Sequence, residues 1–161
     1  MESVNSKKLF FIVTLFFMVF LSFLLFFQKS NPNSKIKDHQ KITLQIAERK
    51  LEVEVVNTPE SITRGLSARE QLGSDGMLFI LPQRVIPRFW MKDMRFNLDL
   101  LWIDGDKIID LTANVPAPKP NTKLQDLPIY SPQLPADKVL ELKSSKIKEL
   151  GIKTGDKLLF L

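Results

Sequence analysis

The stretch RFWMKDMRFNLDLLWIDGDKIID, residues 88–110, decides the fold of this chain. Its second half contains Asp104-Gly105-Asp106, a sequence typical of the tight turn that joins two antiparallel strands. Apolar residues dominate both flanks, with LDLLWI before the turn and KIIDLTANV after it. We therefore expect a β-hairpin over residues 98–115, in which Asp104 and Asp106 belong to the turn.

The first half of the same stretch, RFWMK at residues 88–92, allows two interpretations. In a strand, Phe89 and Met91 would point one way, and Arg88, Trp90 and Lys92 would point the other. Aromatic and methionine side chains commonly fill cores, so the first interpretation is a buried strand. In the second, Trp90 forms the floor of an apolar cavity under a proline-rich loop.

Signals for a second hairpin and a helix precede this stretch. Residues 42–46 and 51–55 each alternate between apolar and polar side chains, and AERK joins them, which predicts a hairpin with one apolar face. Thr58 can cap a helix that begins at Pro59 and ends at Gly65. Ser67 and Glu70 have the spacing of a capping box, which predicts a second short helical turn that ends at Gly73.

The remaining elements follow from short apolar runs and turn residues. We expect strands at residues 77–81, 138–143 and 157–161, and a short helix over residues 144–151. Residues 116–135 contain six prolines and are predicted to form an irregular loop that covers part of the domain. Together these elements predict a mainly β fold, with about seven strands in a small antiparallel β-barrel or sandwich and two or three short helices.

An apolar run, LFFIVTLFFMVFLSFLLFF at residues 9–27, lies ahead of this domain. A helix of that length would extend roughly 28 Å, close to the thickness of the bilayer core, so we predict a single-pass transmembrane helix. Bulky Phe26 and Phe27 close the run in place of the small residues that a signal peptidase requires, and this favours an uncleaved signal anchor.

The charges around the run predict its orientation and its surroundings. Residues 1–8, with Lys7 and Lys8, are expected in the cytoplasm, which places the C-terminal domain outside it at the plasma membrane. Residues 28–41 are expected to be a flexible basic tether, although its lysines weaken the assignment of orientation. Residues 1–41 carry six lysines against two acidic residues, whereas the remaining 17 basic and 16 acidic residues nearly cancel. A near-neutral domain argues against nucleic acid as a partner.

Four motifs resemble one known family. They are TPESITRGLSARE (58–70), DGMLFIL (75–81), FWMKDMRFNLDLLWID (89–104) and LELKSSKIKELGIKTGDKL (140–158). In this order they are similar to the domain of unknown function 192 family, whose pattern includes Arg-Gly-Leu-Met, Gly-Met-Leu-Phe and Phe-Trp-Met-Lys-Asn-Thr. The resemblance implies a small, mainly β domain, often with an N-terminal signal or anchor, and brings no established activity. This chain departs from the pattern at Ser67, at Asp93-Met94 and at Asn97.

The candidate ligand-binding residues are Arg64, Trp90, Lys92, Asp93 and Asp99. The cations and Asp99 are expected near the mouth of a cavity floored by Trp90. Asp99 lies between apolar residues of a predicted strand, so we expect it to pair with Arg64 or Lys92. Asp93 and Asp99 could also form an acid–base pair, although solvated or turn-stabilising carboxylates are the simpler explanation.

Other chemistry finds less support in the sequence. The only histidine, His39, lies in the predicted tether, and the chain lacks cysteine and the G-x-S-x-G motif of a nucleophile elbow. The acids at 104, 106 and 110 lack the spacing of a calcium loop, so no metal and no cofactor is expected.

Three functions remain open at this stage. The first is a membrane-anchored extracytoplasmic β domain that binds an unknown ligand or protein partner without catalysis. The second is an envelope enzyme that acts on a small substrate with Arg64, Lys92, Asp93 and Asp99. The third is a structural subunit of a membrane complex, which packs its phenylalanine-rich helix on partner helices.

Overall fold

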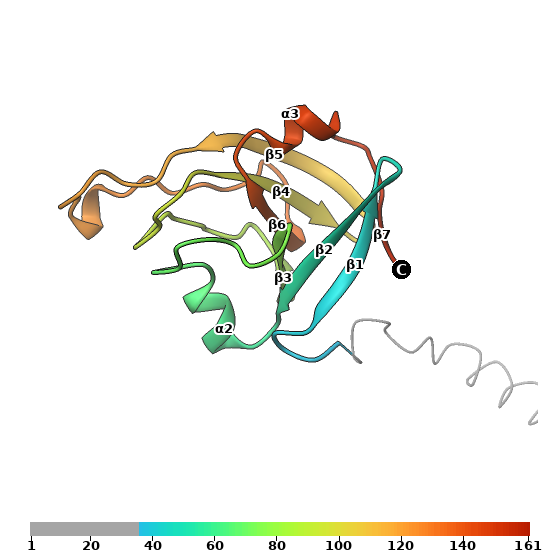
Figure 1. Ribbon diagram of the computed structural model, residues 1–161, viewed down its shortest axis with the longest axis horizontal. Helices are drawn as coiled ribbons and strands as arrows, with labels where there is room; N and C mark the ends of the chain where they lie inside the picture. Colours follow the sequence, from blue (N-terminus) through green and yellow to red (C-terminus); the bar gives the residue numbers. More distant parts are fainter. Residues whose placement is uncertain (1–35) are drawn as a thin grey trace, which may run out of the picture. The chain divides into compact units, whose positions relative to one another are not determined.

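The computed structural model describes residues 36–161, and the compact unit discussed below is Lys37–Leu161 (Figure 1). The predicted cytoplasmic residues, the predicted membrane segment at 9–27 and most of the predicted tether lie outside the described residues. Within the described part, no helix combines the length and the apolar character needed to cross a bilayer.

The domain is mainly β, as expected, and contains one seven-stranded sheet with the order β5-β4-β6-β3-β2-β1-β7. Its strands are β1 (Lys41–Ile46), β2 (Arg49–Val56), β3 (Gly76–Val85), β4 (Leu98–Asp104), β5 (Lys107–Val115), β6 (Ala136–Lys143) and β7 (Leu158–Phe160). The helices are α2 (Pro59–Arg64), α3 (Lys146–Leu150) and the 3-10 helix η2 (Leu124–Asp126). Both predicted hairpins, β1–β2 and β4–β5, are confirmed.

One strand pair departs from the predicted antiparallel arrangement. Strands β2 and β3 are parallel, with Val53 opposite Gly76 and Val56 opposite Phe79. A parallel pair requires a long crossover, and here residues 57–75 supply it through α2. The other pairs in the sheet are antiparallel.

The sheet curls into a half-barrel rather than a sandwich. The beginnings of the two edge strands meet at an isolated bridge between Lys107 and Lys157. Nearby backbone hydrogen bonds from Gly155 to Ile108 and from Leu158 to Asp106 reinforce this contact. In Figure 1 the strands accordingly curve around a common interior, with α2 outside the sheet.

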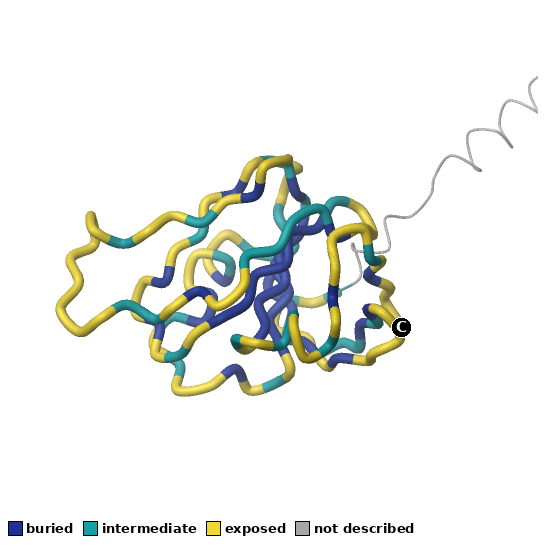
Figure 2. The backbone as a smooth tube through the Cα atoms, turned by 90° about the horizontal axis from the view of Figure 1, so that it is seen from above, coloured by how far each residue is buried: buried dark blue, intermediate teal, exposed yellow. Residues whose placement is uncertain are grey.

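Alternation along the strands gives the sheet two apolar faces. The inner face carries Leu44, Val53, Leu78, Leu101 and Leu140, which are fully buried. The outer face carries Met77, Phe79, Leu100, Trp102 and Val139, and it packs against Leu66, Leu72, Met91 and Met94 from the loops outside the sheet. Figure 2 shows the resulting band of buried backbone through the sheet.

Two predicted elements outside the sheet are wrong. RFWMK is not a strand of the sheet: Phe89 forms an isolated bridge with Tyr130, and the chain then turns. The side-chain alternation is nevertheless as predicted, because Phe89 and Met91 are at least partly buried while Arg88, Trp90 and Lys92 are exposed. No helix forms at Ser67, since its hydroxyl donates to the carbonyl of Lys92 (2.9 Å) instead of capping a helical turn.

The proline-rich segment, residues 116–135, is irregular apart from η2, as predicted. It extends away from the sheet in Figure 1 and is mostly exposed in Figure 2. It contacts the rest of the domain where Phe89 and Tyr130 exchange two backbone hydrogen bonds of 2.9 and 2.8 Å.

Candidate functional site

The candidate site centres on Glu141, a buried acid on the outer face of the sheet. Glu141 lies on β6 between Met77 of β3 and Leu100 of β4, and only 6% of it is exposed. Its carboxyl forms no hydrogen bond or ion pair with any residue that the structure describes. Burial without a partner raises the pKa of Glu141 to about 8.

The Glu141 carboxyl faces open space rather than packed protein. In the described part of the chain, every completely buried side-chain nitrogen or oxygen has a hydrogen-bond partner. The unpartnered oxygens of Glu141 must therefore retain accessible surface, and the residue lines a cavity of about 280 Å³. We call this space the Glu141 cavity. A buried polar group that points into such a cavity is available to a ligand.

Aromatic side chains form the walls of the Glu141 cavity. Phe79, Phe89 and Trp90 line it together with Ile62, Leu66 and Met94. The Phe79 and Phe89 rings meet edge to face with centroids 5.0 Å apart, and Phe89 meets the buried Trp102 in the same way at 5.6 Å. These contacts fix the orientation of the walls. Trp90 is 44% exposed and stands where the cavity opens to solvent.

Helix α2 brings Arg64 to the same cavity. Thr58 caps the helix, as predicted, in a capping box with Ser61, and Pro59 occupies the first turn. Gly65 ends the helix with φ 48°, and a Cβ atom there would lie 3.2 Å from the ring of Phe79. Glycine thus lets the chain turn closely over the aromatic wall. Arg64 and Arg88 are the charged residues that line the cavity besides Glu141.

Four of the five predicted site residues lie together in an adjoining depression. Arg64, Trp90, Lys92 and Asp93 line a space of about 580 Å³ next to α2. Lys92 Nζ lies 3.6 Å from Asp93 Oδ2, and both side chains are about half exposed or more. Arg64 and Trp90 also line the Glu141 cavity, so the two spaces adjoin along these side chains.

The predicted pairing of Asp99 with Arg64 or Lys92 is wrong. Asp99 is completely buried, and its carboxylate accepts hydrogen bonds from the backbone N–H groups of Asn114 and Ile147, each at 2.8 Å. It pairs with neither Arg64 nor Lys92. Ile147 lies in the first turn of α3, where an acceptor satisfies an unpaired backbone donor, so Asp99 joins α3 to the sheet.

The proline-rich loop, which was predicted to cover the cavity, lies elsewhere. The proline-rich segment does not line the Glu141 cavity. Residues 118–122, with Leu124 and Leu127, instead line a separate space of about 560 Å³ together with Lys92, Asp93 and Arg95. The bridge between Phe89 and Tyr130 attaches the later part of the segment to the chain beside the aromatic wall.

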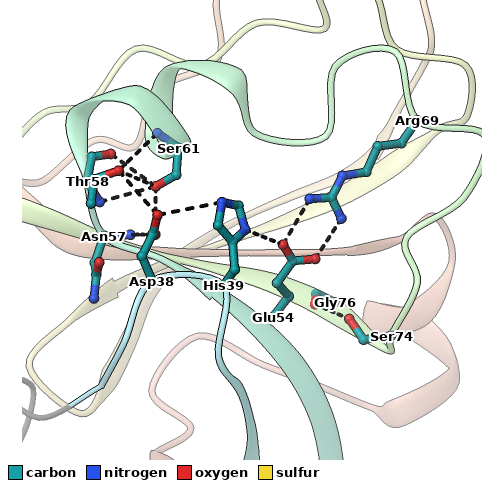
Figure 3. Close-up of polar contacts among 9 residues, drawn as sticks. All are labelled: Asp38, His39, Glu54, Asn57, Thr58, Ser61, Arg69, Ser74 and Gly76. Atoms are coloured by element: carbon teal, nitrogen blue, oxygen red, sulfur yellow. Dashed lines mark hydrogen bonds and ion pairs between the residues drawn. The ribbon is translucent and has the colours of Figure 1, made fainter.

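A polar network connects the start of the domain to α2 and β2 (Figure 3). Ser61 Oγ donates to Asp38 Oδ1 (2.8 Å), and the His39 ring lies between Asp38 (3.5 Å) and Glu54 (2.6 Å). Arg69 binds Glu54 through both terminal nitrogens, at 2.6 and 2.9 Å. Although burial opposes them, the hydrogen bonds from Arg69 lower the pKa of Glu54 to about 2.

No hydroxyl of this network bonds to the His39 ring, so within the described residues the network does not form a nucleophile activated by histidine. The sequence placed His39 in a solvated tether, whereas the backbone N–H of His39 donates to Val55 (2.7 Å) and its ring contacts β2. Within the described residues, no group of three or more histidine, cysteine or acidic side chains gathers in a way that could hold a metal ion.

Comparison with known proteins identifies the family of this domain. The sequence model of DUF192, the domain of unknown function 192, described as "Uncharacterized ACR", matches residues 41–160. The chain belongs to the DUF192 family. Curated proteins contain no match to it.

Two solved structures resemble this DUF192 chain. One, a protein of Sinorhizobium meliloti 1021 named provisionally as a transcription regulator, is 27% identical with a TM-score of 0.67. That match covers 78% of this chain and 97% of the other. A protein of unknown function from Novosphingobium aromaticivorans DSM 12444 is 24% identical with a TM-score of 0.66, over 78% of this chain and 89% of its own. The second likeness concerns the fold alone.

The structure explains how this DUF192 chain accommodates its departures from the family pattern. Asp93 occupies the position of the usual asparagine and has φ 56°, a left-handed conformation that asparagine and aspartate both tolerate. Its carbonyl accepts from the backbone N–H of Ala68 at 2.9 Å, which ties the turn to the loop after α2. Met94 follows it and is buried in the outer core.

Glu141 was missed by the sequence analysis, although a signal for it exists. The residue lies between Leu140 and Leu142 in KVLELK, as Asp99 lies between Leu98 and Leu100. An acid within an apolar strand indicates a buried carboxyl in both cases. Only the structure shows that backbone groups satisfy one carboxylate and leave the other facing a cavity.

Proposed function

We propose that this DUF192 domain binds a small organic ligand in the Glu141 cavity, without catalysis, outside the cytoplasm, on a membrane to which residues 9–27 anchor the chain. The observation that carries the binding site is the buried, unpartnered carboxyl of Glu141 in an aromatic cavity. Leaving such a group unsatisfied costs about 1–3 kcal/mol, and a ligand that bonds to it recovers part of this cost. At about 280 Å³, the cavity is suited to a molecule smaller than a typical drug.

The hydroxyl groups around the cavity support binding rather than nucleophilic chemistry. Ser67 donates to the carbonyl of Lys92 at 2.9 Å, and Thr63 donates to the carbonyl of Pro59 at 2.7 Å. Neither hydroxyl bonds to a group that could remove its proton, which is the arrangement that an activated nucleophile needs.

An acid–base enzyme is the second candidate, and one observation favours it. The pKa of Glu141 is raised to about 8, and a group with a pKa near the working pH transfers protons efficiently. Arg64 and Arg88 line the same cavity and could hold a charged substrate. Turnover of a bound ligand that ceases in Glu141→Gln, while binding persists, would establish this function in place of simple binding.

The binding experiment is a thermal-shift screen of the full chain against a library of small metabolites. Ligands of the Glu141 cavity should raise the unfolding temperature of the wild type and lose that effect in Glu141→Leu. Glu48→Gln is the matched control, because Glu48 is exposed in the turn between β1 and β2. Stabilising ligands that act equally on Glu141→Leu would show that the cavity is not the binding site, and so would a screen without hits.

Membrane attachment is tested separately by cell fractionation. The full chain should stay with the membranes after alkaline carbonate extraction, and a protease added outside spheroplasts should degrade the domain. Replacing the apolar run at residues 9–27 with a polar segment should release the chain. Recovery of the full chain in the cytosol would contradict this part of the proposal.

A further inference from the structure

The lining of the Glu141 cavity contains two arginines and one acid. Arg64 and Arg88 are exposed residues of the lining, and neither guanidinium group forms a hydrogen bond or ion pair within the described residues. Three other arginines of the domain are paired: Arg69 with Glu54, Arg84 with Asp104, and Arg95 with Glu70. The two arginines of the lining are therefore available to an external anion, which a guanidinium group binds through two parallel hydrogen bonds.

The interior of the cavity carries little compensating negative charge. With a pKa of about 8, most Glu141 side chains are protonated at neutral pH. The next acid on this face of the sheet is Glu54, across Met77, and Arg69 already neutralises it. The lining thus combines two cations with a neutral carboxyl that can donate one hydrogen bond.

We propose that the ligand is a small organic anion with an apolar body, an inference that rests on the proposed binding function. Arg64 and Arg88 bind its carboxylate, and Phe79, Phe89 and Trp90 enclose its body. The Glu141 carboxyl donates a hydrogen bond to an oxygen atom at the inner end of the ligand.

The opposite ligand class is a cation, which aromatic walls and a carboxylate can also attract. Two observations disfavour it. Entry of a cation brings it past two unpaired guanidinium groups, and its binding requires Glu141 to lose a proton that burial stabilises. An anion meets neither cost.

The test measures binding of two probes to the full chain in nanodiscs of zwitterionic lipid. The probes are 3-phenylpropionate, an anion, and 2-phenylethylammonium, a cation of similar size. Calorimetry and the fluorescence of Trp90 report binding, and empty nanodiscs correct for partition into lipid. The variants are Arg64→Gln, Arg88→Gln and, as the matched control, Arg49→Gln, which removes an exposed arginine from the distant β1–β2 hairpin.

We expect saturable binding of 3-phenylpropionate that either Arg64→Gln or Arg88→Gln weakens by about tenfold, as the loss of a charge-assisted hydrogen bond implies. Arg49→Gln should bind as the wild type does. Equal or tighter binding of 2-phenylethylammonium, or 3-phenylpropionate binding that is unaffected by both arginine variants, would overturn the assignment to anions.

Failure of this inference is distinguishable from failure of the proposed function. If neither probe binds, and the ligands that the metabolite screen finds to depend on Glu141 carry no anionic group, the anion class is wrong and the binding site stands. If the screen finds no ligand that depends on Glu141, both proposals fail together.

Discussion

At the scale of single residues, two buried acids of the sheet differ in what surrounds their carboxyls. Asp99 accepts two backbone hydrogen bonds at 2.8 Å, from Asn114 and Ile147. Glu141 lies on the neighbouring strand, and its carboxyl bonds to no group in the described part of the chain. A satisfied carboxylate stabilises the fold, whereas an unsatisfied carboxyl raises the free energy of the unliganded protein and is the group that a ligand can use.

Replacing Asp99 should therefore destabilise the protein without touching the ligand site. Asp99→Ala leaves two backbone donors without an acceptor, and we expect a loss of about 2–4 kcal/mol in the free energy of unfolding. Asp99→Asn keeps one acceptor and should lose about half as much. Urea unfolding followed by tryptophan fluorescence measures both changes. The exposed Asp126→Ala should change stability by less than about 0.5 kcal/mol. A stable Asp99→Ala with weakened ligand binding would show that Asp99 belongs to the site after all.

Glu141→Gln should change how stability depends on pH. The pKa of Glu141 is about 8 in the folded protein against 4.5 for the ordinary group, so unfolding releases a proton between these values. The wild type should therefore lose stability as pH rises from 4.5 to 8, and the loss should be complete above pH 8. Glu141→Gln has no titrating group at this position and should not show this loss. The free energy of unfolding of Glu141→Gln, minus that of the wild type, should therefore increase by more than about 2 kcal/mol from pH 4.5 to 8.

Other charged groups lie near Glu141, so the stability of the variant is compared with that of the wild type at each pH. They are Arg64 and Arg88 in the cavity and the Glu54–Arg69 pair with His39 on the same face of the sheet. All of them are present in both proteins, so their contributions cancel in the difference between Glu141→Gln and the wild type. A difference that is constant from pH 4.5 to 8 would mean that the folded pKa of Glu141 is close to its ordinary value.

At the scale of elements, the pairing of β3 with β6 holds the site in place. Strand β3 contributes Phe79 and β6 contributes Glu141, and their register starts with Gly76 opposite Leu142. A Cβ atom on Gly76 would lie 2.6 Å from the carbonyl oxygen of Glu141 and 2.7 Å from Leu142 Cδ2. The close approach of these strands therefore requires glycine at this position.

Gly76→Ala tests that requirement. The added methyl group would force β3 away from β6, and we expect a loss of at least about 2 kcal/mol in the free energy of unfolding. Gly105→Ala is the control: its φ of 61° costs about 1 kcal/mol, but no atom lies within 4 Å of the added Cβ. Equal unfolding midpoints for the two variants would show that the strands tolerate the methyl group.

The elements that the sequence predicted correctly are those set by local signals. Alternation and turn residues located the β1–β2 and β4–β5 hairpins, and Thr58 and Gly65 located the ends of α2. The parallel pairing of β2 with β3 depends on a crossover between distant residues, which local patterns do not encode. RFWMK was mistaken for a strand because alternation persists in a loop that buries Phe89 and Met91 against the outer face.

The candidate site was predictable in part for the same reason. The structure brings Arg64, Trp90, Lys92 and Asp93 to one depression, since the first ends a helix and the others lie in one short loop. That they bind a ligand stays a prediction. Glu141 reaches the cavity from a strand far along the chain. Whether its carboxyl has a hydrogen-bond partner depends on all the residues that pack around it. That property exists only in the folded molecule.

At the scale of the whole molecule, residues 37–161 form a compact unit with its own core on both faces of the sheet. The polar network of Asp38, His39 and Glu54 fixes the first residues of this unit to α2 and β2. A domain whose completely buried polar atoms have partners, and whose apolar faces are buried within it, can fold without a further segment.

Residues 37–161 should therefore fold as an isolated domain. We expect a soluble product with a sigmoidal thermal transition and a β-type circular dichroism spectrum. Beginning the fragment at residue 41 instead removes the Asp38 and His39 contacts and should lower the unfolding temperature by several degrees, as a loss of about 1 kcal/mol implies. Aggregation of the longer fragment, or equal stability of both, would contradict this description.

Both proposals depend on a neutral carboxyl group of Glu141 that faces the cavity, and one measurement tests it most directly. The ¹³C chemical shift of the Glu141 side-chain carboxyl, assigned with Glu141→Gln, can be followed by nuclear magnetic resonance against pH. We predict a titration midpoint near 8 in the unliganded protein. A midpoint near the ordinary value of 4.5 would contradict the account, because Glu141 would then be a solvated or paired carboxylate at neutral pH.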